Sequence, residues 1–303
     1  MTRGRDNSNN LANRMDKTVT GEQLECRYCA NSFPNTRTNC PHCAQPQIFP
    51  NVTKATTDAQ KTRLAESFSS AKDRCGADGR DQQFDELLIA TSHSHALFAC
   101  PLLKLHQLVA SGTDIFATYY QLEELRLRAS APIGMEWARL RPQAEIELLG
   151  SEHHIRHLHY ACLSLDWESL SNYGDCAVKL SESMIGHRAS CFEGNSAVIF
   201  ARRRSFDDCL RSSWEERGKL CCAVLADKVT KDTVSTEFSS LLVQTKDDSV
   251  DDEFVEVHIF GTMTVQTFAE VRFSTASHGR KEDVYRNAII EKLDAVSVAH
   301  SGG

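Results

Sequence analysis

The chain has 303 residues and a formal net charge of −7; 41% of its residues are hydrophobic and 25% are charged. This is the composition of a soluble globular protein, long enough for one sizeable domain with small appendages. The negative charge gives no electrostatic reason to bind nucleic acid or an anionic membrane surface. The sequence has no apolar run long enough to cross a bilayer. We therefore expect partners other than nucleic acid and membranes.

The N-terminal residues 1–22 are rich in Asn, Ser, Thr and Arg. They lack the apolar core of a secretory signal peptide. Low hydrophobicity of this kind predicts a disordered leader. Such a leader is compatible with export by a needle-type secretion machine.

Four cysteines follow the leader in the pattern C-x2-C-x10-C-x2-C. They are Cys26, Cys29, Cys40 and Cys43. Two such short turns can place four thiolates tetrahedrally around one ion, and zinc suits a closed, all-sulfur site without a redox role. The segment is too short to bury a core, so the metal would supply its folding free energy. We predict a structural zinc ribbon at residues 23–50.

The other eight cysteines are scattered through apolar segments. They are Cys75, Cys100, Cys162, Cys176, Cys191, Cys209, Cys221 and Cys222. This distribution is typical of small buried side chains in a reducing compartment and not of a disulfide framework. We therefore expect the protein to work in a cytosol.

Residues 51–150 predict a linker followed by a helical region. Apolar side chains recur there with helical spacing, as in Leu64, Phe68 and Ala71. Further apolar stripes, including Leu97 and Phe98, continue this pattern. We expect the region to pack on the domain that follows it.

Residues 151–303 predict an α+β domain with a largely antiparallel sheet. Short runs of strand-forming residues occupy residues 158–164, 176–180, 188–192, 197–200, 220–225, 254–260 and 264–273. Helices are predicted between or after them at residues 167–172, 234–244 and 284–296.

The stretch 152–160 is rich in histidine, and His153 and His157 have the spacing of two metal ligands on one helix face. No third ligand of matching geometry accompanies them. Surface or structural histidines are therefore expected here in preference to a second metal site.

The stretch 254–260 alternates with a period of two, as a strand does. Val255, Val257 and Ile259 share one face. Glu256 and His258 share the other face with two phenylalanines. A half-buried strand explains this pattern. The more specific interpretation is a single carboxylate, Glu256, held over a cleft on a rigid strand.

Polar residues upstream are suited to a nucleotide cleft of an unusual kind. Glycines near residues 174 and 194 let backbone approach a ligand, and Ser and Asn side chains supply hydrogen bonds. The sequence has neither G-x-G-x-x-G after a strand nor G-x4-G-K-[ST], which argues against a Rossmann or P-loop site.

At these residues the sequence resembles mono-ADP-ribosyltransferases, and more narrowly the bacterial effectors that ADP-ribosylate ubiquitin on a threonine, which have fungal relatives. The stretches that carry the resemblance are residues 173–180, 187–196, 214–217 and 253–261, within a segment of similarity from residue 158 to residue 273. The resemblance implies a split antiparallel β-sandwich with NAD, as substrate, in its cleft. It also implies a secreted effector that acts in a host cytosol, with a cytoplasmic protein as the alternative.

The resemblance assigns the catalytic carboxylate to Glu256, because the catalytic Glu of the family is followed by an apolar residue, here Val257. A carboxylate stabilises the oxocarbenium-like charge that forms as nicotinamide leaves. His258 points the same way and can help an acceptor hydroxyl lose its proton. The residues predicted to contact NAD are His159, Tyr160, Tyr173, Arg188, Ser190, Asn195 and Ser196.

Two departures from the family pattern bear on the acceptor and on the NAD contacts. Phe254 stands where arginine-specific members carry a second Glu and asparagine-specific members carry Gln, which favours a hydroxyl acceptor. The stretch 188–190 is the nearest equivalent of the family's Ser-Thr-Ser strand.

A second class of function remains open. The zinc ribbon can belong to a non-enzymatic adaptor, or to a pseudo-enzyme whose C-terminal domain only binds a protein partner. Consumption of NAD by the purified protein distinguishes the two classes.

Overall fold

The computed structural model describes residues 23–26, 29–34, 39–44, 49–110, 115–124, 136–167, 170–274 and 280–302. The chain forms two compact units, Met1–Ile48 and Phe49–Gly303. The leader predicted at residues 1–22 lies outside the described residues.

The first unit contains two short antiparallel strands, β1 (Gln23–Glu25) and β2 (Ser32–Pro34). Its small buried cluster consists of Cys26, Phe33 and Cys40. So little apolar burial does not stabilise a fold by itself, and small scaffolds of this size rely on a metal or on disulfides.

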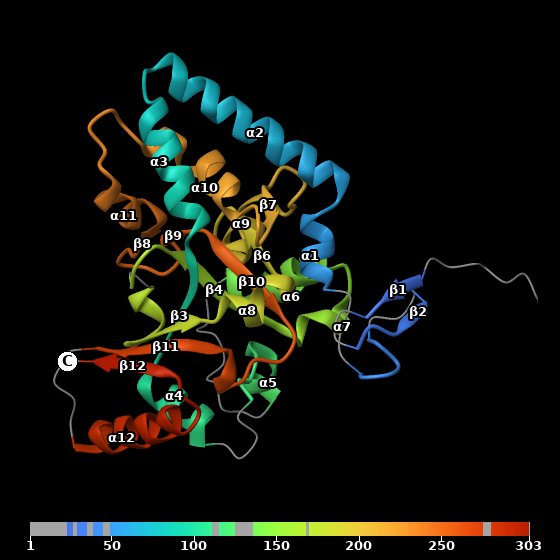
Figure 1. Cartoon of the computed structure of the whole chain (residues 1–303), viewed down its shortest axis with the longest axis vertical. Helices are drawn as coiled ribbons and strands as arrows, with labels where there is room; N and C mark the ends of the chain where they lie inside the picture. Colours follow the sequence, from blue (N-terminus) through green and yellow to red (C-terminus); the bar gives the residue numbers. More distant parts are fainter. Residues whose placement is uncertain are drawn as a thin grey trace, which may run out of the picture. The chain divides into compact units, whose positions relative to one another are not determined.

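The second unit consists of one large sheet covered by helices (Figure 1). Its strands are β3 (His95–Cys100), β4 (Leu158–Ser164), β5 (Cys176–Leu180), β6 (Ala189–Phe192), β7 (Arg211–Ser213), β8 (Val243–Gln244), β9 (Glu253–Phe254), β10 (Glu256–Phe260), β11 (Phe268–Phe273) and β12 (Ala299–Gly302). Its helices are α1 (Pro50–Ala55), α2 (Asp58–Ala77), α3 (Asp81–Ser92), α4 (Leu102–Ala110), α5 (Tyr119–Glu124), α6 (Glu136–Leu149), α7 (Glu152–Ile155), α8 (Glu182–Ile185), α9 (Ser196–Arg203), α10 (Arg217–Leu225), α11 (Phe238–Leu242) and α12 (Arg280–Ala295). Short 3-10 turns are η1 (Ser171–Tyr173), η2 (Gly186–Arg188), η3 (Ala226–Lys228), η4 (Ser235–Glu237) and η5 (Val265–Thr267).

The large sheet has the strand order β12-β11-β5-β3-β4-β10-β6-β7. Its strands pair antiparallel, except that β12 runs parallel to β11, so the sheet is mixed. A second, two-stranded sheet joins β8 and β9. The predicted α+β class is confirmed in this general form.

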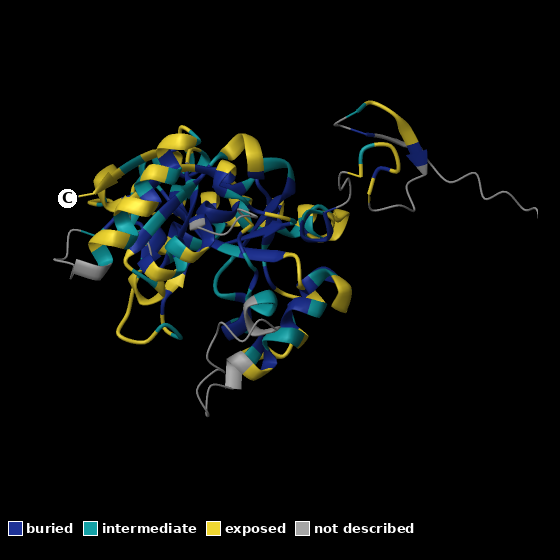
Figure 2. Ribbon diagram, turned by 90° about the horizontal axis from the view of Figure 1, so that it is seen from below, coloured by how far each residue is buried: buried dark blue, intermediate teal, exposed yellow. Residues whose placement is uncertain are grey.

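Both faces of the sheet are covered, which makes the strands mostly buried (Figure 2). On one face, Val257 and Ile259 of β10 join an apolar cluster with Leu87 of α3 and Leu220 of α10. Helices α3 and α10 pack against each other there, and α4 packs against α12 near β12 (Figure 1). The other face packs against α6 and α9. Strand β10 is therefore buried on both sides, and Glu256 lies in the interior.

The predicted strand at residues 197–200 is wrong, because these residues belong to helix α9. The side chain of Asn195 accepts a hydrogen bond from the Val198 N–H at 3.2 Å and caps the helix. Such a cap satisfies one of the N–H groups that a helix start leaves unpaired. The helix start also leaves the Ser196 N–H available for another acceptor.

The predicted strand at residues 220–225 is also wrong, because this segment is part of helix α10. Its apolar run is buried on several sides, including Leu220, Cys221 and Cys222. A short, uniformly apolar run has no periodicity that separates a buried strand from a buried helix.

A third correction concerns residues 95–100, which the sequence places in the helical region. They form β3, which lies between β4 and β5 inside the sheet. Leu97 and Phe98 enter different apolar clusters on the two faces of the sheet. Because both faces are covered by apolar residues, the strand shows no alternation of polar and apolar side chains.

The predicted strand at residues 254–260 is interrupted at Val255. Phe254 pairs with Val243 in the small sheet, whereas β10 starts at Glu256 in the large sheet. The Val255 carbonyl accepts a hydrogen bond from the Leu163 N–H at 2.9 Å. The break changes the direction of the chain directly before Glu256.

The remaining predicted helices and strands agree in part with those of the structure. Strands β4 and β5 have the predicted bounds, β6 starts one residue late, and β11 covers the second half of residues 264–273. Helix α12 confirms the helix predicted at residues 284–296. The helix predicted at residues 234–244 is confirmed in part, as the 3-10 turn η4 and helix α11, and its last two residues form β8. No helix among the described residues is long and apolar enough to span a membrane.

Candidate active site

Glu256 begins β10, between β4 and β6, and its side chain is almost completely buried. Its Oε2 accepts a hydrogen bond from the Ser196 N–H at 3.0 Å and lies 2.8 Å from His258 Nε2. Two hydrogen bonds on one oxygen fix the carboxylate, and among the described residues none engages Oε1.

The Glu256 side chain lies on the wall of a small pocket of about 100 Å³. The wall combines apolar side chains with a few polar ones. It consists of Leu97, Phe98, Ala99, Arg141, Tyr160, Ala161, Cys162, Leu170, Tyr173, Asn195, Ser196, Ala197, Phe254 and Glu256. A volume well below the roughly 300 Å³ of a typical small-molecule site admits a single ring and not a dinucleotide.

Glu256 stays ionised although it is buried. Burial by itself would raise the pKa of its carboxyl group, but the hydrogen bonds and charge interaction with His258 and the Ser196 N–H outweigh burial and lower it. The Ser196 N–H lies at the start of α9, where N–H groups favour negative charge. A charged carboxylate in a mostly apolar pocket interacts strongly with any developing cation.

This lowered pKa makes a testable contribution to stability. The ordinary value is 4.5, so ionised Glu256 stabilises the fold above about pH 4.5, and this contribution is lost as the pH falls through the lower native pKa. The free energy of unfolding of the wild type, minus that of Glu256→Gln, should therefore shrink as the pH is lowered below 4.5. Urea unfolding of both proteins between pH 7 and pH 3.5 measures it. A difference that grows in acid contradicts the expected sign.

His258 is not one of the residues that line the pocket. Its ring stacks on Phe192 at a centroid distance of 5.8 Å and meets Tyr160 edge-on at 5.4 Å. The Asn51 side chain of α1 donates hydrogen bonds to the His258 carbonyl at 2.8 Å and to the Ser190 hydroxyl at 3.1 Å. His258 is therefore placed to orient Glu256.

A polar cluster from helix α6 adjoins the pocket and was not predicted from the sequence. Glu145 is buried, and its Oε1 accepts hydrogen bonds from the Tyr160 hydroxyl and, at 2.7 Å, from Arg141 Nε. The guanidinium carbon of Arg141 lies 4.2 Å and 4.5 Å from the ring centroids of Tyr119 and Tyr160. The one signal in the sequence was the i,i+4 spacing of Arg141 and Glu145 on a helix, which is common on exposed surfaces.

Of the residues predicted to contact NAD, four line the pocket with Glu256: Tyr160, Tyr173, Asn195 and Ser196. Tyr173 keeps 40% of its surface exposed, and partial enclosure by its neighbours, followed by the Glu256 charge, raises its pKa to about 12. Ser190 shares this face of the sheet, where its hydroxyl binds Asn51.

Arg188 and His159 do not reach the pocket. The Arg188 guanidinium is buried and donates to the carbonyls of Phe260, Thr262 and Met184 at 2.8–3.0 Å. His159 lies on the opposite face of β4 from Tyr160, against Phe116. Burial lowers the pKa of His159 to about 3, so the ring is neutral. Both side chains are therefore packed inside the fold, away from the pocket.

A larger cleft of about 760 Å³ adjoins the small pocket, and the two share Asn195 and Phe254. Its basic side chains are Arg202, Lys228 and Lys246, and acidic side chains outnumber them. Its volume lies within the range of small-molecule sites. Together the two spaces can hold a ring and a longer attached group.

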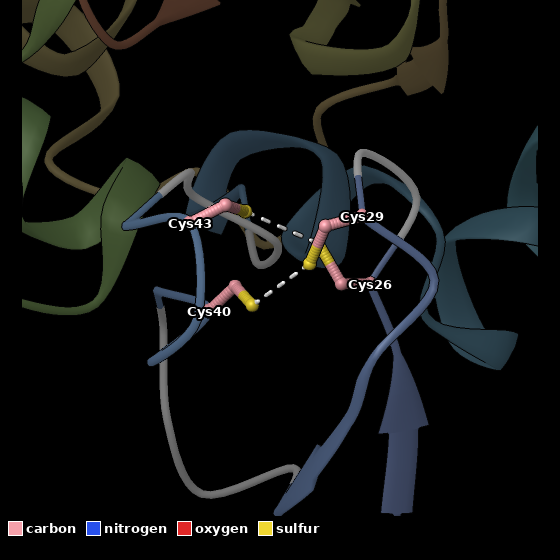
Figure 3. Close-up of side chains that lie close together, drawn as sticks. All are labelled: Cys26, Cys29, Cys40 and Cys43. Atoms are coloured by element: carbon pink, nitrogen blue, oxygen red, sulfur yellow. Dashed lines mark hydrogen bonds between the residues drawn. The ribbon is translucent and has the colours of Figure 1, made fainter.

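The four cysteines of the first unit converge as the spacing predicts (Figure 3). Their sulfur atoms lie within 4.8 Å of one another, with 3.5 Å between Cys26 and Cys43 and 3.6 Å between Cys29 and Cys40. These distances are too long for disulfide bonds, and they are close to the ~3.8 Å that a tetrahedron with zinc–sulfur bonds of ~2.3 Å requires. The cluster can hold a structural metal.

The backbone around the cysteines also suits a metal. In each C-x2-C turn the N–H after the second cysteine binds the carbonyl of the first, from Ala30 to Cys26 and from Ala44 to Cys40. A hydrogen bond from the Asn31 side chain leads the effects that lower the pKa of Cys29 to about 6, which favours the thiolate. Among the described residues, no other group of three or more ligand side chains forms, and none includes His153 or His157.

No protein-family model and no curated protein sequence matches the chain.

Proposed function

We propose that the protein is an NAD-dependent mono-ADP-ribosyltransferase with Glu256 as its catalytic carboxylate. The observation that carries this proposal is the fixed, ionised Glu256, with Oε1 unoccupied by described residues, on the wall of a ring-sized pocket. The adjoining cleft supplies room for the remainder of a dinucleotide. The sequence resemblance to ADP-ribosyltransferases agrees with these features.

In this proposal the nicotinamide ring occupies the small pocket beside Tyr173. The bond between the ring nitrogen and C1′ of the ribose breaks, and nicotinamide leaves with the bonding electrons. Glu256 stabilises the positive charge that develops on the ribose, as carboxylates do in glycoside hydrolysis. The acceptor hydroxyl then bonds to C1′ and releases its proton to solvent at the open cleft.

His258 and Ser196 hold the catalytic carboxylate in this proposal. Both bind Oε2, so Oε1 faces the substrate without competition from the side chains around it. His258 acts as a positioning residue, because its Nε2 is engaged by Glu256 and its ring is enclosed by Phe192 and Tyr160. In this proposal the positioning role takes the place of the direct role in proton transfer that the sequence suggested for His258.

The acceptor we propose is a protein hydroxyl. The resemblance alone suggests that this hydroxyl belongs to a threonine of ubiquitin and that its modification blocks ubiquitination in a host cytosol. The wall residue Phe254 supports a hydroxyl acceptor, because it leaves no carboxylate two positions before Glu256 to orient a guanidinium. The zinc ribbon stabilises the first unit and takes no part in the reaction.

The proposal predicts transfer of one ADP-ribose to an acceptor hydroxyl. Incubation of the full chain with NAD and ubiquitin should add one ADP-ribose, detected by intact mass spectrometry. Neutral hydroxylamine cleaves arginine-linked and ester-linked ADP-ribose, so it should leave this product intact. Release of the label by hydroxylamine would contradict a serine or threonine acceptor.

A non-enzymatic adaptor is the second candidate. The four-cysteine cluster favours it, because it belongs to a separate compact unit and a closed four-thiolate site has no open position for catalysis. An adaptor binds its partner without consuming NAD. Absence of NAD consumption, with and without candidate acceptors, would favour this function over the transferase.

A further inference from the structure

The guanidinium of Arg141 is a preorganised hydrogen-bond donor on the wall of the Glu256 pocket. Among the described residues its one hydrogen bond runs from Nε to Glu145 Oε1 at 2.7 Å. A bidentate pair would also use an Nη group and the second carboxylate oxygen. Here Glu145 Oε2 is buried without a hydrogen bond to the described residues, so the pair is not bidentate. Both Nη groups remain for a ligand.

The surroundings of Arg141 hold the guanidinium in place before a ligand arrives. Its carbon lies 4.2 Å from the ring centroid of Tyr119 and 4.5 Å from that of Tyr160. The Tyr160 hydroxyl binds the same carboxylate oxygen of Glu145 as Arg141 does. Contacts of this type restrict the side chain, and a planar fork of donors in a fixed position suits an oxygen acceptor.

The charges around the pocket decide which acceptor fits. Glu145 balances the charge of Arg141 directly, and Glu256 adds a second carboxylate to the pocket wall. A ligand carboxylate or phosphate placed in the pocket would lie close to the ionised Glu256 in surroundings of low polarity, where like charges repel each other strongly. An uncharged carbonyl oxygen avoids this repulsion and still accepts hydrogen bonds from Arg141.

We infer that Arg141 contacts the ligand directly and donates to the carbonyl oxygen of a flat, uncharged aromatic carboxamide, while Glu256 disfavours the corresponding carboxylate. The two Nη groups donate to the carboxamide oxygen, and the apolar wall takes the ring. The inference rests on the proposed function in naming the nicotinamide end of NAD as the natural ligand. Arg141 is then a ligand-binding residue, contributed by helix α6.

The test compares nicotinamide with nicotinate, which share the ring and differ in charge. Titration calorimetry on the full chain should give nicotinamide at least ~10-fold the affinity of nicotinate, because Glu256 repels the nicotinate carboxylate. Arg141→Lys keeps the positive charge and removes the fork, and it should lower nicotinamide affinity by ~10-fold or more. Glu256→Gln removes the repelling charge and should bring the two affinities together, an effect that a purely structural loss would not produce.

Two further variants keep the test decisive if Arg141→Lys folds poorly. The double variant Arg141→Met with Glu145→Gln removes both charges of the pair and leaves no buried carboxylate uncompensated. It should bind nicotinamide ~10-fold or more weakly than the wild type, and nicotinate should stay the weaker ligand because Glu256 remains. Glu152→Gln, on α7 outside the pocket, is the control and should bind as the wild type does.

Three results would overturn the inference: no nicotinamide binding by the wild type, tighter binding of nicotinate, or wild-type nicotinamide affinity in both Arg141 variants. The test of the proposed function is separate from the test of Arg141. Carboxamide-selective binding that depends on Arg141, without ADP-ribose transfer, would retain the role of Arg141 and reject the transferase. Transfer with wild-type nicotinamide affinity in both Arg141 variants would reject the role of Arg141 alone.

Discussion

Replacement of Glu256 by glutamine should reduce ADP-ribose transfer by on the order of a hundredfold or more, the scale for losing one stabiliser of a transition state. Glutamine keeps the volume of the side chain and can still accept the hydrogen bond from the Ser196 N–H. It removes the charge that stabilises the ribose cation. The melting temperature at neutral pH should fall by only a few degrees, since the apolar face of β10 is unchanged.

Glu253→Gln is the matched control for this experiment. Glu253 lies three residues upstream on β9, is exposed, and forms ion pairs with Lys228 and Lys246. Its replacement removes one of several carboxylates from the neighbouring cleft and leaves the carboxylate of the small pocket in place, so transfer should fall far less than in Glu256→Gln. Loss of transfer in Glu253→Gln with normal transfer in Glu256→Gln would assign catalysis to Glu253 instead.

Loss of the first pair of cysteines should abolish metal binding by the first unit. We expect about one equivalent of zinc in the purified chain, because four thiolates complete one closed tetrahedral site. Cys26→Ser with Cys29→Ser removes half of the ligands and should reduce the zinc content to near zero by elemental analysis. The first unit buries very few apolar side chains, so its strands should lose their order with the metal.

A control with two other cysteines makes this result specific. Cys75 and Cys100 are buried in the second unit, and their replacement by alanine should leave the zinc content unchanged. Zinc retained by Cys26→Ser with Cys29→Ser would contradict the four-cysteine assignment. We also expect the Cys26 and Cys29 variant to keep much of its NAD chemistry, since the ribbon and the Glu256 pocket belong to different units.

Local sequence patterns were sufficient for two features of this protein. The C-x2-C-x10-C-x2-C spacing predicted which four side chains converge, because each short turn by itself directs its two thiolates to one point. The alternation around Glu256 predicted its strand and the face it shares with His258, because side chains of a strand alternate with a fixed period of two. Both patterns are set within a few neighbouring residues.

Other features depended on contacts between distant segments. Residues 95–100 and 197–200 were assigned the wrong element, since short runs that are apolar on all sides carry no periodicity. The cluster of Arg141, Glu145 and Tyr160 could not be predicted, because a helix and a strand bring these side chains together only after folding.

The placement of individual residues around Glu256 shows the same limit. Arg188 was one of the predicted NAD contacts, yet in the fold its guanidinium donates to three backbone carbonyls, while Arg141 reaches the pocket. The sequence alone determined which residue types are available and which of them share a strand face or a metal-binding turn. The tertiary structure decided which side chains meet, because burial forces each polar group to pair with whatever donor or acceptor the packing brings within reach.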